Sequence, residues 1–176
     1  MRPIASALTI SNNWLAIVSG KILQKRKRTL AVDFEYVQNG LTMSPLFNKL
    51  NLKDQNEILV VNAPASFDTE LALLDAVTIR RDVAKSRQCQ FALVFAVKQT
   101  EVDKYSEALA GKLEGDAILW FAYPKGSSKK YQCDFNRDTG WDVLRSLGFD
   151  TVRMVAIDAD WSALRFRRVE FIRNRA

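Results

Sequence analysis

The stretch that decides the fold is EILVVNAPAS, residues 57–66. Its first half is a continuous apolar run, which is typical of a strand that a parallel sheet buries on both faces. Its second half stands where a nucleotide-binding α/β domain places a glycine-rich loop, yet it contains no glycine. The stretch therefore predicts a cofactor-binding scaffold whose phosphate or carboxylate cradle departs from the usual form.

Strand and helix patterns alternate from Met43 onward. Ser44 and Pro45 favour a helix start, because serine caps helix N-termini and proline suits the first helical position. Strands are predicted at 57–61, 77–83, 91–97, 117–123, 151–157 and 163–171, with helices at 45–50, from Ser66, from Thr100 to about Gly115, and from Asp138 to Gly148. The helix from Thr100 shows a capping-box pattern with Asp103. The sequence thus predicts an α/β, Rossmann-like three-layer sandwich, mostly parallel, with a C-terminal antiparallel hairpin.

The charge of the chain divides it into two parts. Residues 1–42 hold six basic and two acidic side chains, and so carry +4 of the formal net charge of +6. We therefore expect residues 1–42 to be an N-terminal extension, either flexible or a mis-assigned start, and residues 43–176 to form the Rossmann-like domain. The apolar run 4–18 is interrupted by Asn12 and Asn13, and is too short and polar to span a bilayer, so no membrane span is expected.

Histidine is missing from the whole chain. This removes the commonest general base, the commonest metal ligand and every serine–histidine or cysteine–histidine nucleophile. The two cysteines, Cys89 and Cys133, lie far apart and form no CxxC pair, which favours free thiols in a reducing cytoplasm. The sequence therefore predicts a cytoplasmic protein with no catalytic residue set and no metal site.

Candidate ligand-binding residues follow the strands of the predicted sheet, because ligands of open α/β sheets bind beyond the carboxyl ends of the strands. The loop after the first strand offers backbone amides and the Ser66 hydroxyl at a helix N-terminus. Pro64 removes one donor from that loop, which argues against the standard cofactor pose. Lys125 could hold an anion as a point charge, or be a solvated loop lysine. The candidates are Asn62, Ala63, Ala65, Ser66, Tyr123, Lys125 and Gly126.

Acidic residues gather in the predicted terminal hairpin, where Asp158 and Asp160 precede Trp161. Paired carboxylates could serve acid–base chemistry. Turn chemistry explains the aspartates as well, and a tryptophan at a strand entry usually packs. The sequence favours this structural interpretation.

Three segments resemble a family of small bacterial proteins that has no assigned function and a degenerate, class I methyltransferase-like Rossmann fold. They are residues 58–66, residues 119–126 and above all AIDADWSALRF at 156–166. The resemblance covers Met43 to about Arg168 and leaves residues 1–42 outside. It implies the fold, a cytoplasmic setting and a missing glycine motif, and it brings no catalytic residue with it.

Three functional hypotheses remain open at this point. The first is a non-catalytic or cryptic Rossmann-like module that senses a small anionic ligand or binds a protein partner. The alternative is a transferase that uses S-adenosylmethionine or a nucleotide through a non-standard cofactor loop, for which Asp82 is the candidate to hold ribose hydroxyls. The third is nucleic-acid binding by one basic face, and it is disfavoured because the domain is close to neutral. This face would consist of the N-terminal tail, Lys125, Lys129, Lys130, Arg165, Arg167, Arg168, Arg173 and Arg175. The sequence identifies no cofactor.

Overall fold

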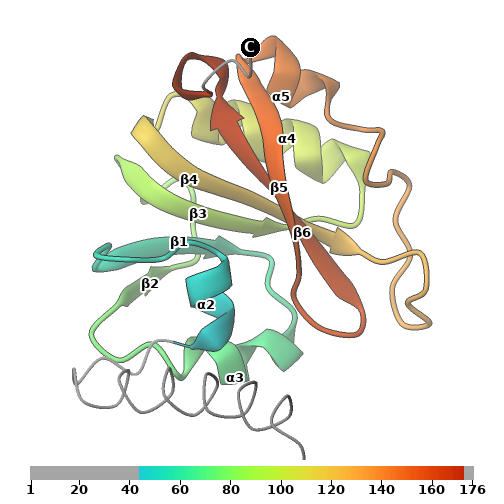
Figure 1. Cartoon of the computed structure of the whole chain (residues 1–176), viewed down its shortest axis with the longest axis horizontal. Coiled ribbons are helices and arrows are strands. Elements are labelled where there is room, and N and C mark those ends of the chain that lie inside the picture. The colour runs from blue at the N-terminus through green and yellow to red at the C-terminus, as the bar shows by residue number, and fades with distance from the viewer. Residues whose placement is uncertain (1–43, 173–176) are drawn as a thin grey trace, which may run out of the picture. The chain divides into compact units, whose positions relative to one another are not determined.

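A computed structural model of the chain describes residues 44–172, and the predicted extension at residues 1–42 lies outside them. Within this part the strands form one sheet in the order β2-β1-β3-β4-β6-β5 (Figure 1). The strands are β1 (Glu57–Val61), β2 (Thr78–Arg80), β3 (Cys89–Phe95), β4 (Leu113–Pro124), β5 (Phe149–Ala156) and β6 (Trp161–Arg168). The helices are α2 (Pro45–Lys49), α3 (Asp68–Leu71), α4 (Gln99–Ala110) and α5 (Asp142–Ser146), with 3-10 turns η1 (Ala65–Phe67) and η2 (Val169–Phe171).

Strands β1 to β4 run parallel, while β6 is antiparallel to both of its neighbours, β4 and β5. This is the predicted mostly parallel sheet with a C-terminal antiparallel hairpin, so the predicted fold class is confirmed. Helices α2 and α3 lie on one side of the sheet and α4 and α5 on the other (Figure 1).

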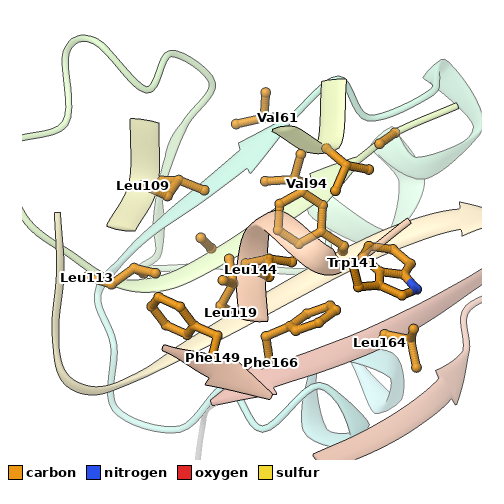
Figure 2. Close-up of a cluster of buried hydrophobic side chains, with 14 of the residues drawn as sticks. Val61, Val94, Leu109, Leu113, Leu119, Trp141, Leu144, Phe149, Leu164 and Phe166 are labelled. Carbon is orange, nitrogen blue, oxygen red and sulfur yellow. The ribbon is translucent and has the colours of Figure 1, made fainter. Parts of the chain in front are cut away.

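Side chains of the central strands alternate between two buried cores, as the two-residue period of a strand requires. On β3, Leu93 faces α2 and α3, whereas Val94 faces α4 and α5. Figure 2 shows the second core, where Trp141 and Leu144 from the α5 region meet Phe166 of β6. Burial on both faces accounts for the unbroken apolar runs of β1 and β3 in the sequence.

Local capping follows the sequence at α2 and departs from it at η1. Ser44 Oγ accepts a hydrogen bond from Leu46 N at 3.2 Å, as predicted. Ser66, in contrast, is not an N-cap, and that prediction was wrong. Pro64 precedes the 3-10 turn, and its carbonyl accepts from Phe67 N at 2.8 Å. The fixed φ of the proline and the burial of Phe67 start the turn before Ser66 can cap it.

The predicted limits of α4 were also wrong. The helix begins at Gln99, because Glu101 Oε2 accepts from Val97 N at 2.8 Å and from Lys98 N at 3.0 Å. Asp103 instead accepts from the Gln99 side chain. The helix ends at Ala110, so Gly115 is not its stop but lies within β4 with a φ of +54°.

Two further predictions need correction. The second strand is shorter than predicted, since β2 covers only Thr78–Arg80 at the sheet edge, and Asp82 therefore lies in the connection beyond it. Asp138 does not cap the following helix, because α5 begins at Asp142 after Trp141. The backbone amide of Asp138 bonds to the Asn136 side chain in the preceding loop.

Candidate functional site

The structure places four of the seven candidate residues in the lining of two separate hollows beyond the carboxyl ends of the strands. The first, here called the β1–α4 hollow, has a volume of about 460 Å³ and is lined by Val61, Asn62, Arg81, Asp82, Val83, Ala84, Lys104, Tyr105, Ala108 and Lys112. The second, the β4–β6 hollow, has a volume of about 620 Å³ and is lined by Tyr123, Pro124, Lys125, Gly126, Ser128, Tyr131, Gln132, Cys133, Phe135, Asn136, Arg137 and Ser162. Asn62 therefore lines one hollow, and Tyr123, Lys125 and Gly126 line the other.

Asn62 follows the last residue of β1 and has a φ of +54°, in the left-handed region that glycine occupies most easily. Asparagine tolerates this region better than other side chains do, because its short amide can bond locally. Here Asn62 Oδ1 accepts from the Tyr105 hydroxyl at 3.2 Å. Asn62 thus gives the turn after β1 the backbone conformation of the missing glycine, and it ties that turn to α4.

The loop after Asn62 carries unused donors. Neither the amide of Ala63 nor those of Ala65 and Ser66 has a hydrogen-bond acceptor among residues 44–172. Pro64 between them contributes no donor. Amides without an acceptor can bind a carboxylate or a phosphate, so anion binding by Ala63, Ala65 and Ser66 stays a prediction. None of the three lines the β1–α4 hollow.

Asp82 stands at the rim of the β1–α4 hollow, two residues past β2. Its Oδ1 accepts from Ala84 N at 2.8 Å, and no contact occupies Oδ2 within the described chain. The neighbouring Arg81 is turned to Asp68, at 2.8 Å, and does not pair with Asp82. One carboxylate oxygen of Asp82 is therefore open to a ligand hydroxyl.

Lys125 in the β4–β6 hollow already has a protein partner. Its ammonium donates to the carbonyl of Asp158, and its backbone amide donates to Asp160 O at 2.7 Å. The same turn binds Ser128, whose Oγ donates to Asp160 Oδ1 at 2.8 Å. These contacts fasten the loop after β4 to the terminal hairpin, and anion binding by Lys125 stays a prediction.

Two titratable groups of the β4–β6 hollow, Cys133 and Tyr123, are not prepared for nucleophilic chemistry. Burial raises the pKa of the Cys133 thiol above its ordinary value, although a backbone hydrogen bond from the thiol to Phe135 opposes the shift. Burial likewise raises the pKa of Tyr123, whose hydroxyl has Met154 Sδ as a neighbour at 3.6 Å. Both groups therefore stay protonated at neutral pH.

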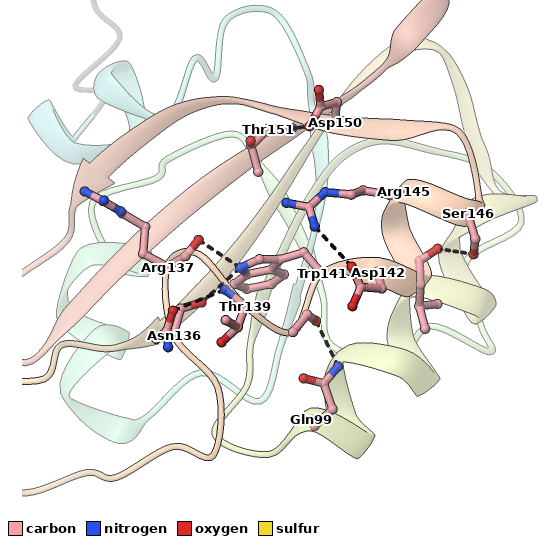
Figure 3. Close-up of polar contacts among 12 residues, drawn as sticks. Gln99, Asn136, Arg137, Thr139, Trp141, Asp142, Arg145, Ser146, Asp150 and Thr151 are labelled. Carbon is pink, nitrogen blue, oxygen red and sulfur yellow. Dashed lines mark hydrogen bonds and ion pairs between the residues drawn. The ribbon is translucent and has the colours of Figure 1, made fainter.

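One wall of the β4–β6 hollow is a loop that hydrogen bonds from Trp141 and Gln99 hold in place (Figure 3). Trp141 Nε1 donates to the carbonyls of Asn136 and Arg137 at 3.0 and 3.1 Å. Gln99 Nε2, at the start of α4, donates to Gly140 O at 2.8 Å. The loop is thus fixed by the buried Trp141 and the partly buried Gln99 rather than by regular secondary structure.

The acidic residues of the terminal hairpin are turn residues, as the sequence favoured. Asp158 Oδ1 accepts from the backbone amides of Asp160 and Trp161 at 2.8 and 2.7 Å. Trp161 is buried against Phe95 and Tyr131. The predicted free state of both cysteines is confirmed.

Tyr105 lines the β1–α4 hollow, but the sequence did not mark it as a candidate site residue. The helical spacing of Tyr105 marked it as a core residue, but it is only partly buried and its hydroxyl reaches the end of β1. A tyrosine on a core-facing stripe is a weak signal for a hollow, because its polar end usually finds a partner at the rim.

Residues 44–172 contain neither a membrane-spanning helix nor a cluster of metal ligands. No helix there is long and apolar enough to cross a membrane. No group of three or more cysteine, aspartate or glutamate side chains in the same part of the chain could hold a metal ion.

Comparison with known proteins identifies the fold. No family model matches the chain, and no curated protein matches it significantly. Among solved structures it is similar to an S-adenosylmethionine-dependent methyltransferase from Aquifex aeolicus, with a TM-score of 0.51 and 12% identity over 73% of this chain and 90% of that one. It is also similar to the pyocyanin biosynthetic protein PhzM, with a TM-score of 0.50 and 11% identity over 82% of this chain and 58% of that one. These likenesses show the fold alone, a methyltransferase-like Rossmann fold, as predicted.

Proposed function

We propose that this chain is a transferase that binds S-adenosylmethionine, or a related nucleotide, in the β1–α4 hollow through a loop without glycine. The observation that carries the proposal is the left-handed turn at Asn62, with a φ of +54°, at the mouth of a hollow beyond β1 and β2. Ligands of this sheet architecture bind at that edge. The proposal adopts the transferase alternative over the non-catalytic module.

The residues around the hollow suit the parts of an adenosyl ligand. The open oxygen of Asp82 can accept from a ribose hydroxyl. The ring of Tyr105, which lines the hollow, offers an aromatic surface to a base. The amides of Ala63 and Ala65 do not line the hollow, but they follow Asn62 in the adjoining loop and can bind a carboxylate or phosphate. The volume of about 460 Å³ falls in the range of about 300–1,000 Å³ that small-molecule sites occupy.

Transfer of a methyl group does not require the residues that this chain lacks. A bound S-adenosylmethionine would supply an activated methyl group, and the protein would contribute by holding the acceptor in line and excluding water. Neither a histidine nor an ionised thiol is needed for that role. The absence of histidine from the sequence is therefore compatible with transfer.

The test is a calorimetric titration of the full chain with S-adenosylmethionine, its demethylated product and ATP. We expect one of them to bind and to raise the melting temperature by mass action. Asp82→Asn should weaken that binding about tenfold, or about 1.4 kcal/mol. Glu107→Gln is the matched control, because it makes the same chemical change at an exposed position of α4 that does not line the hollow, and it should leave affinity unchanged.

Two results would reject the proposal. One is the absence of binding by all three compounds at millimolar concentration, which would favour the non-catalytic module. The other is binding that Asp82→Asn leaves intact, which would move the ligand away from the β1–α4 hollow.

A further inference from the structure

A half-buried arginine on β6 has an unsatisfied hydrogen-bond donor. The Nε atom of Arg165 is buried and has no partner within residues 44–172. Arg165 pairs with Trp120 across the sheet, and Trp120 belongs to the core beneath α2 and α3, so both side chains lie on that face. A buried donor without a partner costs free energy, and one on a charged group costs more.

Two more arginines lie beside it on the same face. Arg153 of β5 is the direct cross-strand partner of Arg165. Arg167 lies two residues further along β6, and residues two apart in a strand share a face. Neighbouring strands are about 4.8 Å apart, so these guanidinium groups can reach a common point.

The carboxylates nearby do not balance this charge. Asp116 is held by Arg167, whose Nε donates to Oδ1 at 2.6 Å and whose Nη2 donates to Oδ2. Asp150 lies opposite Arg167, and its Oδ1 accepts from Thr151 N at 2.7 Å. Neither Arg153 nor Arg165 forms an ion pair in the part of the chain that the structure describes.

The pKa of the Arg165 guanidinium reflects both its burial and the charges around it. Burial lowers the pKa of its guanidinium, and the charges of Arg167 and Arg153 lower it further, while Asp116 opposes them. Arginine nevertheless stays protonated in proteins. Arg165 is therefore a partly desolvated cation that forms no ion pair of its own within residues 44–172, since the nearest influential carboxylate, Asp116, is paired with Arg167.

We propose that Arg153 and Arg165 bind the phosphate group of a small molecule on the α2 face of the β5–β6 hairpin. A guanidinium presents parallel N–H donors that match two phosphate oxygens, and two guanidiniums on neighbouring strands can flank one phosphate. The ligand would accept from the buried Nε of Arg165 and offset the excess charge. Nothing in this proposal depends on the β1–α4 hollow.

The size of the cluster favours a single phosphate over a nucleic-acid backbone. A polymer needs a continuing row of basic side chains. The next arginine of β6, Arg168, instead lies over the Phe149 ring at 4.8 Å and donates to Ala110 O at 2.8 Å, on the α4 side of the sheet. Lys125 and Lys130 are bound at the terminal hairpin turn. Among residues 44–172, the basic residues that the sequence suggested as one face are thus divided, while Arg173, Arg175 and the N-terminal tail lie outside the described residues.

The experiment is a titration of the full chain with inorganic phosphate at constant ionic strength, followed by calorimetry and ³¹P NMR. We expect millimolar or tighter binding. Arg153→Ala, at an exposed position, should weaken it at least tenfold. Arg165→Lys keeps the charge and loses the paired donors, so it should weaken binding by a similar factor. Arg145→Ala, which removes an exposed guanidinium paired with Asp142 on α5, is the control and should change nothing.

A further variant should strengthen phosphate binding instead of weakening it, because it removes a negative charge beside the arginines. Asp116→Asn releases Arg167 from its carboxylate, so phosphate binding should become several-fold tighter. The proposal is overturned if phosphate does not bind, if Arg153→Ala and Arg165→Lys leave its affinity unchanged, or if Asp116→Asn weakens it. It is also overturned if a single-stranded RNA oligonucleotide binds more than tenfold tighter than phosphate at the same salt concentration and loses more affinity in Arg153→Ala.

Discussion

Replacing Gly140 with alanine should destabilise the protein more than the same change at any other glycine of positive φ in residues 44–172. Gly140 has a φ of +93°, and an added Cβ would lie 2.4 Å from Gln99 Oε1 and 2.7 Å from Phe135 Cβ. Gln99 also donates to the carbonyl of Gly140, so the glutamine can swing away only by losing that bond (Figure 3). Phe135 Cβ is fixed to the backbone and cannot move alone.

The expected cost combines two effects. A left-handed backbone costs a residue with a Cβ about 1–2 kcal/mol. Relieving an overpacked contact costs a further 1–3 kcal/mol or so. Gly148 has a φ of +81° but no heavy atom within 4 Å of an added Cβ, so Gly148→Ala should show the first cost alone. We expect Gly140→Ala to lose about 3 kcal/mol, roughly 6–12 °C in melting temperature, and Gly148→Ala about half of that.

The measurement is urea unfolding of both variants and the wild type, followed by circular dichroism and by tryptophan fluorescence. The difference between the two variants isolates the steric contact, because the backbone term is common to both. Equal losses for the two variants would refute the argument that Gln99 and Phe135 close off this position.

Three further predictions concern the core, the pH and the extension. Trp120→Phe removes the buried bond from Nε1 to Leu50 O at 2.8 Å and should cost about 2 kcal/mol in urea unfolding; a loss under about 0.5 kcal/mol would contradict it. The hydrogen bond from Arg167 lowers the pKa of Asp116 below its ordinary 3.8, so this pair stabilises the fold above that pH and the benefit is lost on further acidification. Because the pair is partly exposed, Asp116→Asn should cost only a few tenths of a kcal/mol at pH 7. Acid titration should show this difference shrink and disappear as the pH falls below 3.8, the ordinary pKa of the carboxyl. Removal of residues 1–42 should change the melting temperature of the remainder by less than about 2 °C; a larger loss would show that the extension packs on the domain.

The sequence predicts best those strands that are buried on both faces, because their burial leaves a continuous apolar run in the sequence. Strands β1 and β3 are apolar on both faces, and in an α/β chain a short run of this kind is typical of a central strand. The start of α2 is equally well marked, because Ser44 and Pro45 each act locally and agree with each other. Agreement between local and global preferences makes these elements predictable.

The ends of other elements depend on competition that the sequence does not resolve. Glu101 and Asp103 both offer a carboxylate near the start of α4, and either pattern resembles a cap. Strand β3 ends at Phe95, which brings the amides of Val97 and Lys98 within reach of Glu101 rather than of Asp103. The choice of cap is therefore made by the sheet, through where the strand stops.

The candidate site was hard to predict for a related reason. A glycine motif is a sequence marker for a backbone conformation, and that conformation is what a bound ligand requires. Asn62 adopts it without glycine, at a cost that its bond with Tyr105 helps to offset. A search for glycines therefore misses a turn that the backbone nevertheless makes.

The β1–α4 hollow exists because one connection is short. A right-handed crossover from β2 to β3 must pass over the α4 side of the sheet, and there it brings Val83 into the core beside α4. Residues 81–88 make this crossing without a helix. Lys112 holds the crossing in place, since its ammonium donates to the carbonyls of Val83 and Ser86 at 2.8 and 2.7 Å. A helix at this point would cover the end of β1 and fill the space beside Tyr105, so the shortened connection leaves this edge of the sheet open to a ligand.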